Sequence, residues 1–464
     1  MAGVAPEKRD TTQMKELKFF VITDTHYFKN SLGAYGDEYE RFMDFEQKCF
    51  AETENINKAI FEYLEKADEA DIILIAGDLS FNGEKESHKD FSALLENFEE
   101  KTGKKIFVLT AGHDSNEHPF AYDGGERISP EGTKFTELYD FYRKFGYDRA
   151  IEFNKEHMSY VAELSDDVRL LVICNDTAER NNADFSEEFF EWIEAQAKKA
   201  QQDGKMMIAM EHYPVIPGQP IFGLIADARQ KGGKRIIETL ADNGVHLIFT
   251  GHMHNQSINV EETEKGNLFY DVCTGSAIGC PAFIRLVTIK DENTVEIESI
   301  PVPDFEWDKK GMTGEEYLKV QFEKMIRTYI DSMYKDPKRF LDKLRIKDTA
   351  LIEKLVVFGG KKLSKMTIGG FAKLFCVSVD KSIRKNSFVN FAIDIVRYVF
   401  EGNQPYKEGT HEGDAILKFV KRIKPFVKNL KDAHGNEVDL YELIKHTVGN
   451  YGLDDYNAVL KLKK

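Results

Sequence analysis

Six side chains of types that bind metals follow apolar runs between residues 24 and 254 of this 464-residue chain. Histidine nitrogens and carboxylate oxygens are the ligands that hold divalent transition metals in hydrolytic sites. Side chains that follow several strands of an open α/β sheet converge on one crevice at the carboxyl edge of that sheet. The sequence therefore predicts one metal centre with these ligands: Asp24, His26, Asp78, His212, His252 and His254.

The elements that must position these side chains are short apolar strands. The runs FFVIT, DIILIAG, KIFVLTA, MMIAM and VHLIFT each end at a polar motif, in the order DTH, GDLSFNG, GHD, EH and GHMH. Helical segments over 52–69, 84–102 and 186–203 lie between the runs. His88, in the second of these helices, is expected to face solvent. A stretch without helical pattern follows the last motif, and it predicts further strands up to about residue 300.

The order of these motifs resembles that of the calcineurin-like metallophosphoesterases, over roughly residues 17–300. The motif order, with each motif after a strand, carries the resemblance, because any single motif is common by chance. It implies an α/β fold of the α+β sandwich type, in which two mixed β-sheets pack face to face and are flanked by helices.

The resemblance also implies a dinuclear metal centre of Mn, Fe or Zn, whose identity the sequence leaves open. One metal would be held by Asp24, His26 and His254, the other by His212 and His252, and Asp78 would bridge the two. Two cations about 3.5–4 Å apart clamp the attacking and leaving oxygens of a phosphoryl transfer and lower the pKa of a bound water. A bridging hydroxide would then attack phosphorus.

The resemblance implies that His113 is a general acid beside the metals, with Asp114 as its orienting partner. An imidazole that protonates the departing oxygen contributes about 10²–10⁴-fold in rate. A neighbouring carboxylate selects the tautomer of such a histidine and favours its protonated form.

One position departs from the family pattern, because Gly112 stands where the family has an Asn that binds the second metal. A water molecule, Asn116 or a substrate oxygen could complete the set of ligands around the second metal. Alternatively, His113 could become a ligand and leave Asp114 or another group as the acid. In a third interpretation the second metal is weakly bound and the protein is a poor enzyme. An engineered replacement of an ordinary Asn is also compatible with the sequence.

Two long loops follow the first and third motifs. The loop over 27–48 is rich in aromatic residues, so a ring there could stack on a nucleobase. The alternative, which we favour, is an insertion that packs its own small core. The loop over 115–135 has a predicted turn at Asp123, Gly124 and Gly125. Such loops beside strand ends are often functional, and a tolerated insertion is the alternative.

Composition divides the chain into three parts. Residues 1–16 are polar, lack the apolar core of a signal peptide, and are interpreted as a disordered leader. Residues 17–303 form the predicted catalytic domain, and residues 304–464 an α-helical accessory domain with apolar residues at helical spacing. Residues 1–300 hold 32 Lys and Arg against 56 Asp and Glu, whereas the remainder holds 31 against 23. Solvated helix faces explain the basic remainder most simply, and docking between domains or attraction of a phosphate-bearing partner are alternatives.

The sequence thus predicts a metal-dependent phosphoester hydrolase, and a phosphodiester such as a cyclic nucleotide is the favoured substrate. Helical C-terminal additions and a stretch like 128–152 also occur in bacterial phosphodiesterases that act on cyclic nucleotides. A phosphomonoesterase is the nearer alternative, and a non-catalytic scaffold on a degenerate phosphoesterase fold is the more distant one.

Expected partners are small phosphoesters, including nucleotides, without membrane insertion or stable nucleic-acid binding. Five cysteines do not form a disulfide framework, so a cytoplasmic setting is expected. The oligomeric state stays open.

Overall fold

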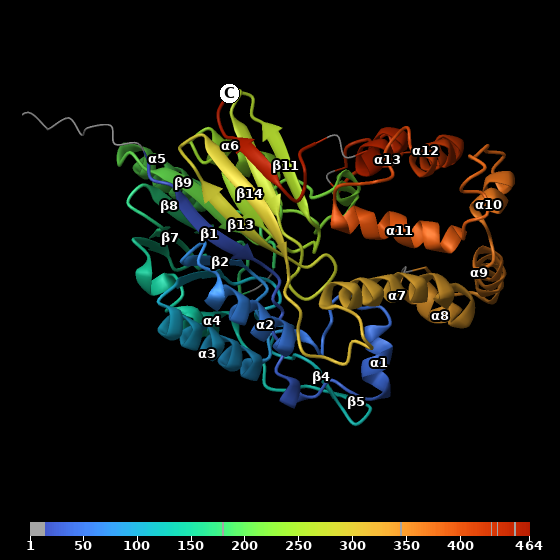
Figure 1. The fold of residues 1–464 in the computed structure, drawn as a ribbon, viewed down its shortest axis with the longest axis horizontal. Coiled ribbons are helices and arrows are strands. Elements are labelled where there is room, and N and C mark those ends of the chain that lie inside the picture. Colours follow the sequence, from blue (N-terminus) through green and yellow to red (C-terminus); the bar gives the residue numbers. More distant parts are fainter. Residues whose placement is uncertain (1–13, 179–180, 344–345, 428, 434, 450–451) are drawn as a thin grey trace, which may run out of the picture.

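The computed structural model describes residues 14–178, 181–343, 346–427, 429–433, 435–449 and 452–464. Most of the expected leader, residues 1–13, lies outside the described residues. Two large β-sheets form the body of the part predicted to be catalytic (Figure 1). Apolar residues from both sheets share one core, in which the Phe19 and Phe249 rings meet edge to face at a centroid distance of 5.5 Å.

The first sheet has six strands in the order β15-β14-β13-β1-β2-β3. Its central strands are parallel and buried, as their continuous apolar runs predict. On the other side of β1, β13 and the strands beyond it run antiparallel to their neighbours. The strands are β1 (Leu17–Ile22), β2 (Ile72–Ala76), β3 (Lys105–Leu109), β13 (Phe283–Ile289), β14 (Thr294–Pro301) and β15 (Ala458–Lys461).

The second sheet has seven strands in the order β11-β12-β10-β9-β8-β7-β6. The strands β8, β9, β10 and β12 are parallel, and the outer strands pair antiparallel. Its strands are β6 (Glu152–Asn154), β7 (Ser159–Glu163), β8 (Val168–Ile173), β9 (Met206–Glu211), β10 (Leu247–Thr250), β11 (Ser257–Glu262) and β12 (Leu268–Cys273). The predicted pair of mixed sheets is confirmed.

Helices flank the two sheets, and three of them lie in the ranges that the sequence predicts. Apolar residues of α2 (Thr53–Lys66), α3 (Lys85–Thr102) and α4 (Leu138–Tyr142) join the core of the first sheet. Apolar residues of α5 (Glu187–Gln202) and α6 (Gly233–Ala241) form a separate core against the second sheet. Crossover helices between parallel strands place all the motif loops at the same edge of each sheet.

The two long loops pack against each other and form a small core of their own. The first contains α1 (Asp37–Met43), and the second contains the hairpin of β4 (Ala121–Asp123) and β5 (Glu126–Ile128). The Tyr122 N–H donates to the Gly33 carbonyl at 2.8 Å. Phe28, Tyr39, Phe50 and other apolar residues are buried together there. The packing alternative for the loop over 27–48 is therefore confirmed.

The C-terminal third is a group of helices on one side of the two sheets (Figure 1). These helices are α7 (Gly314–Lys335), α8 (Pro337–Lys343), α9 (Ala350–Leu363), α10 (Ile368–Leu374), α11 (Phe388–Glu401), α12 (His411–Ile423) and α13 (Leu440–Gly449). The chain then returns to the first sheet, where β15 pairs antiparallel with β14. The expectation of one purely helical segment to the C-terminus is wrong, because the last strand completes the sheet of the catalytic part.

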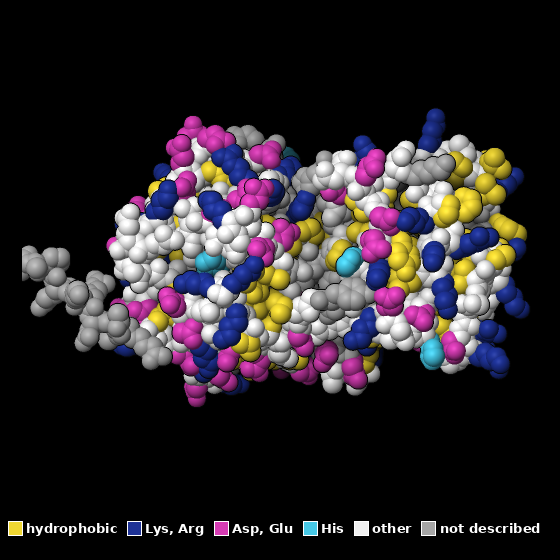
Figure 2. Space-filling model, turned by 90° about the horizontal axis from the view of Figure 1, so that it is seen from above, with side chains coloured by type: hydrophobic (Ala, Val, Ile, Leu, Met, Phe, Trp, Pro, Cys, Tyr) yellow, Lys and Arg dark blue, Asp and Glu magenta, His cyan; other side chains and the backbone are white. Residues whose placement is uncertain are grey.

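Hydrophobic side chains reach the surface at the helical end of the molecule (Figure 2). Leu351, Leu355 and Phe358 on α9 are all exposed. Among the described residues, no helix combines the length and apolar character needed to cross a bilayer.

Candidate metal centre

All six predicted ligands lie in loops at the carboxyl ends of strands. Asp24 and His26 follow β1, and Asp78 follows β2, so the first sheet contributes three ligands. The second sheet contributes His212 after β9, and His252 and His254 after β10. The structure therefore brings together side chains that lie up to 230 residues apart in the sequence.

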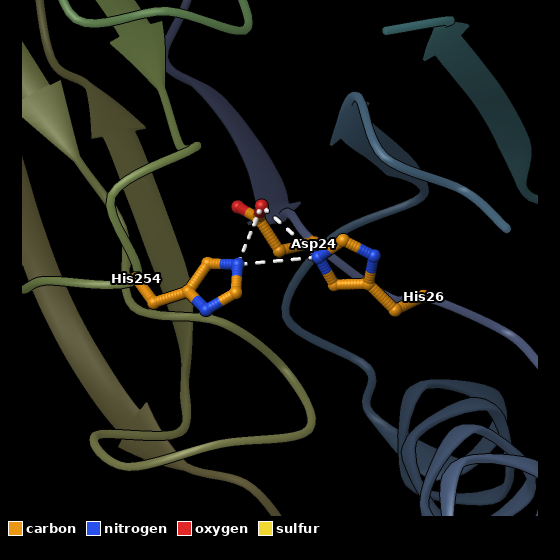
Figure 3. A group of neighbouring side chains, drawn as sticks. All are labelled: Asp24, His26 and His254. Atoms are coloured by element: carbon orange, nitrogen blue, oxygen red, sulfur yellow. Dashed lines mark hydrogen bonds and ion pairs between the residues drawn. The ribbon is translucent and has the colours of Figure 1, made fainter. Parts of the chain in front are cut away.

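Asp24, His26 and His254 form the first group of ligand atoms. Figure 3 shows the His254 ring meeting the other two side chains from the opposite side. Its Nε2 lies 3.1 Å from Asp24 Oδ1 and 3.1 Å from His26 Nε2. The His26 Nε2 lies 3.5 Å from the same carboxylate oxygen. One ion could contact all three atoms at once.

Asp78, His212 and His252 form the second group, whose ligand atoms lie within 4.8 Å of one another. His212 Nε2 is 3.1 Å from Asp78 Oδ2. That same oxygen lies 3.7 Å from His26 Nε2, so Asp78 stands between the two groups. This arrangement suits a shared carboxylate between two ions.

Backbone carbonyls fix the orientation of three of the histidine rings. His26 Nδ1 faces the Ser80 carbonyl at 3.3 Å, and His212 Nδ1 faces the Ala76 carbonyl at 2.8 Å. His252 uses Nε2 instead, which faces a main-chain carbonyl at 2.7 Å. Because a carbonyl only accepts, each of these nitrogens donates, and the other nitrogen of each ring is the candidate ligand atom.

The backbone around the ligands is held in a conformation that side chains rarely adopt. Five of the six ligands have positive φ angles, between 37° and 67°. Non-glycine residues pay an energetic penalty there, and such residues cluster at functional sites. Close packing excludes a side chain at Gly251, whose Cβ would lie 2.4 Å from Asp24 Oδ2.

The electrostatics of the two groups fit bound cations. Asp24 Oδ1 and His212 Nε2 are buried and have no hydrogen-bond partner. Burial opposes charge on both groups, yet the nearby imidazoles hold the pKa of Asp24 well below its ordinary value. Burial also opposes charge on His212, but Asp78 and Asp24 outweigh it and raise the pKa of His212 to about 10. A divalent cation would replace the proton on His212 Nε2 and offset the negative charge of the Asp24 and Asp78 carboxylates.

His113 lies beside both groups, as expected for a group that handles a proton. Its backbone N–H donates to Asp78 Oδ1 at 2.9 Å, and its ring lies 4.8 Å from the His26 ring. Its Nδ1 faces the Phe81 carbonyl at 2.8 Å, which makes Nδ1 the donor. Burial, followed by the charge of Lys48, lowers the pKa of His113.

The expected contact between Asp114 and the His113 ring is wrong. The Asp114 oxygens accept instead from the backbone N–H groups of Ser80 at 2.8 Å and Ala111 at 2.7 Å. The partner of the His113 ring is thus the Phe81 carbonyl, and the Asp114 carboxyl holds the shape of the loop. A role for Asp114 in catalysis stays a prediction.

His88 is also placed differently from the expectation, because it is fully buried. Its Nε2 donates to the Asp114 carbonyl at 2.8 Å, and its Nδ1 accepts from the Tyr142 hydroxyl at 2.7 Å. Burial lowers the pKa of His88 to about 4, so the ring is neutral at ordinary pH. This histidine supports the loop that carries His113.

The space beside Gly112 is filled by side chains from two other loops. A Cβ at this position would lie 2.9 Å from Asn181 Nδ2 and 2.9 Å from the Tyr213 hydroxyl. The Asn181 amide donates to the Gly112 carbonyl at 3.1 Å. Asn116, considered as a replacement ligand, uses its Oδ1 to accept from the His118 N–H at 2.9 Å. Its side-chain oxygen is therefore engaged within its own loop.

Sequence reasoning missed three side chains around the centre, namely Lys48, Asn181 and Tyr213. Tyr213 directly follows His212, and its ring lies 4.3 Å from the His252 ring. The position of Tyr213 directly after a predicted ligand could have indicated that it lies at the centre. Asn181 and Lys48 lie in loops without a motif, and only the folded chain brings them near the other residues.

No curated protein matches the chain in sequence. Three solved structures resemble it in fold: a dimetal phosphatase from Danio rerio, a purple acid phosphatase from yellow lupin (Lupinus luteus) seeds and a putative 5′-nucleotidase from Staphylococcus aureus. The first is 10% identical, with a TM-score of 0.43, and the match covers 61% of this chain and 96% of that chain. The second is 15% identical with a TM-score of 0.39, and the match covers 63% of this chain and 53% of that one. The third is 12% identical with a TM-score of 0.38, and the match covers 68% and 59%.

The family assignment rests on the sequence itself. A sequence model of the calcineurin-like phosphoesterase family matches residues 17–256, which is more than half of the chain. The matched span begins at β1 and ends just after the GHMH motif, so it contains all six predicted ligands and His113. The chain therefore belongs to the calcineurin-like phosphoesterase family.

Proposed function

We propose that this protein hydrolyses a phosphodiester, such as a cyclic nucleotide, by metal-dependent chemistry. The observation that carries the proposal is the meeting of two histidine and carboxylate groups at Asp78, with the buried atoms Asp24 Oδ1 and His212 Nε2 left without a hydrogen-bond partner. The resemblance of residues 128–152 and of the C-terminal helices to bacterial phosphodiesterases supports the diester preference. A phosphomonoester is the alternative substrate.

The six ligands divide the work of holding two divalent ions. Asp24, His26 and His254 would hold one ion, His212 and His252 the other, and Asp78 both. When bound, such ions supply a nucleophile from water and neutralise charge on the phosphate. The carbonyls of Ser80 and Ala76 keep the rings of His26 and His212 aimed at the centre.

His113 would give a proton to the departing oxygen. Its Nδ1–H is committed to the Phe81 carbonyl, so Nε2 is the atom that carries the transferable proton. The bond from its backbone N–H to Asp78 keeps the ring beside the shared carboxylate. A lowered pKa makes a protonated His113 a stronger acid.

Metal content and turnover, measured on the same preparations, test this proposal. We expect elemental analysis to find two transition metal ions per chain, and bis-p-nitrophenyl phosphate to be cleaved faster than p-nitrophenyl phosphate. We expect Asp78→Ala to lose both metal and activity. We expect His113→Ala to keep most of its metal and to lose about 10²–10⁴-fold in rate, because it removes only the acid.

Two outcomes would count against the proposal in different ways. A wild-type protein that binds no metal and cleaves neither ester would contradict the hydrolase function. Faster cleavage of the monoester would leave hydrolysis standing and overturn the diester preference.

The cellular setting is part of the same proposal. All five cysteines are free thiols in the structure. Unpaired thiols suit a reducing compartment, so we place the enzyme in the cytoplasm.

A further inference from the structure

Lys48 is a buried cation beside the metal centre. It lies at the end of the loop between β1 and α2, and only 7% of its surface is exposed. Its ammonium group stands over the Phe81 ring, 4.6 Å from the ring centroid. Within the described parts of the chain, no carboxylate lies within ion-pair distance of this ammonium group. The charge is therefore desolvated and lacks a protein counter-ion.

The contacts of Phe81 tie Lys48 to one side of the centre. The Phe81 carbonyl holds the His113 ring, and the Phe81 ring lies 6.0 Å from the His26 ring. The Phe81 ring therefore contacts both the Lys48 ammonium group and the side of the centre where His26 and His113 lie.

Glu84 is a buried acidic group whose pKa the Lys48 charge lowers slightly. It is fully buried, and its Oε2 accepts from the Asn82 N–H at 3.2 Å, whereas its Oε1 has no hydrogen-bond partner. Burial raises the pKa of Glu84 to about 7, and Lys48 offsets this only as a minor cause. A carboxyl that is half protonated near neutral pH does not balance the lysine.

An unpaired buried charge is costly, and it is kept where it serves a ligand. A lysine acts on phosphate as a compact point charge with three donors. We propose that Lys48 binds a phosphate oxygen of the substrate on the side of the centre formed by His26 and His113. This inference rests on the proposed phosphoester hydrolysis, and it adds a positive charge from a loop outside the metal motifs.

Binding of inorganic phosphate to the metal-loaded protein tests the role of Lys48 without turnover. We expect Lys48→Met to weaken phosphate binding roughly tenfold in calorimetry, because the variant lacks the charged donor to the phosphate oxygen. Lys48→Arg should bind within about threefold of the wild type, because it keeps the charge. Lys324→Met is the matched control, since Lys324 is an exposed cation on the neighbouring helix α7. Metal content should be the same in all four proteins.

Thermal unfolding separates this role from a purely structural one. Removal of an unpaired buried charge should leave the melting temperature of Lys48→Met unchanged or raised. Unchanged phosphate affinity in Lys48→Met, or a lowered melting temperature with no rescue of binding by Lys48→Arg, overturns the proposal. If the wild type binds no metal, the proposed function fails, and Lys48 is judged by phosphate binding to the metal-free wild type and Lys48→Met.

Discussion

At the scale of single residues, the metal motifs are strained positions that the surrounding loops hold in place. Asp24, His26 and Asp78 all have positive φ angles, and each lies directly after a buried strand. Backbone bonds join these loops, since the Asp24 N–H donates to the Gly77 carbonyl and the His26 N–H to the Asp78 carbonyl. These hydrogen bonds between loops hold the backbone in its strained conformation, and strained residues persist only where the surrounding structure fixes them.

Gly112 gives the first prediction at this scale. Gly112→Asn should lower the free energy of unfolding by about 1 kcal/mol, because overpacking beside Asn181 and Tyr213 costs roughly 1–3 kcal/mol. Asn181→Ala should relieve that cost in the double variant, since it removes one of the crowded groups. Urea unfolding of the two single variants and the double variant measures this coupling.

Metal occupancy of the same proteins shows what the crowding does to the centre. The added Asn should raise occupancy of the second group only in the double variant, where it has room. Strictly additive changes in stability, with equal occupancy in the Gly112→Asn and double variants, would contradict this account.

At the scale of elements, α3 links the first sheet to the loop that carries His113. His88 on α3 donates to the Asp114 carbonyl, and Glu84 immediately precedes the first turn of the helix. The apolar residues Phe91, Leu95 and Phe98 anchor the helix in the main core. A change in α3 is therefore transmitted to the loop that carries His113.

Glu84 gives a prediction about pH. Its ordinary pKa is 4.5, and burial raises the folded pKa to about 7. Between these values the folded protein keeps a proton that the unfolded chain has released, so stability from this group is full below 4.5 and lost as pH rises through 7. The free energy of unfolding should fall by about 3 kcal/mol over this range relative to Glu84→Gln.

Urea unfolding at the two ends of that pH range measures the difference. Glu100→Gln on the same helix is the control, because Glu100 is exposed and should leave the wild-type slope in place. An equal slope for the wild type and Glu84→Gln would show that Glu84 ionises in the folded protein as it does in the unfolded chain.

At the scale of the whole molecule, the helical part is an insertion between two paired strands of the first sheet. The chain leaves after β14 and returns as β15. The buried Arg285 on β13 donates to the Asp455 carbonyl at 2.7 Å, and Asp455 accepts from the Ile258 N–H at 2.9 Å. These bonds tie the C-terminal segment to both sheets.

The two neighbouring residues Val459 and Leu460 give a matched prediction. Leu460 is fully buried in the main core, so Leu460→Ala should lower the free energy of unfolding by about 2–5 kcal/mol. Val459 is 57% exposed on the same strand, and Val459→Ala should change it by about 0.5 kcal/mol or less. Urea unfolding of the metal-loaded protein measures both. Equal losses would show that β15 does not contribute to the stability of the catalytic part.

The sequence by itself predicted the central strands, three of the flanking helices and six candidate ligands that the structure brings together. Buried parallel strands require continuous apolar runs, and a ligand must follow such a run to reach the carboxyl edge of its sheet. Both requirements leave a local pattern, as in FFVITDTH and VHLIFTGHMH. The family resemblance then predicted how the ligands divide into two groups, and the two clusters of ligand atoms have that composition.

Only the tertiary structure decided which side chains surround those ligands. Asn181 beside Gly112, Lys48 over Phe81 and the Phe81 carbonyl on His113 join residues from different loops. The expected bond from Asp114 to His113 is absent because the Asp114 carboxylate accepts from nearby backbone N–H groups instead. The return of β15 escaped detection because a four-residue strand carries too little periodicity to reveal its partner. Long-range packing sets these contacts, and it leaves no repeating signal in the sequence.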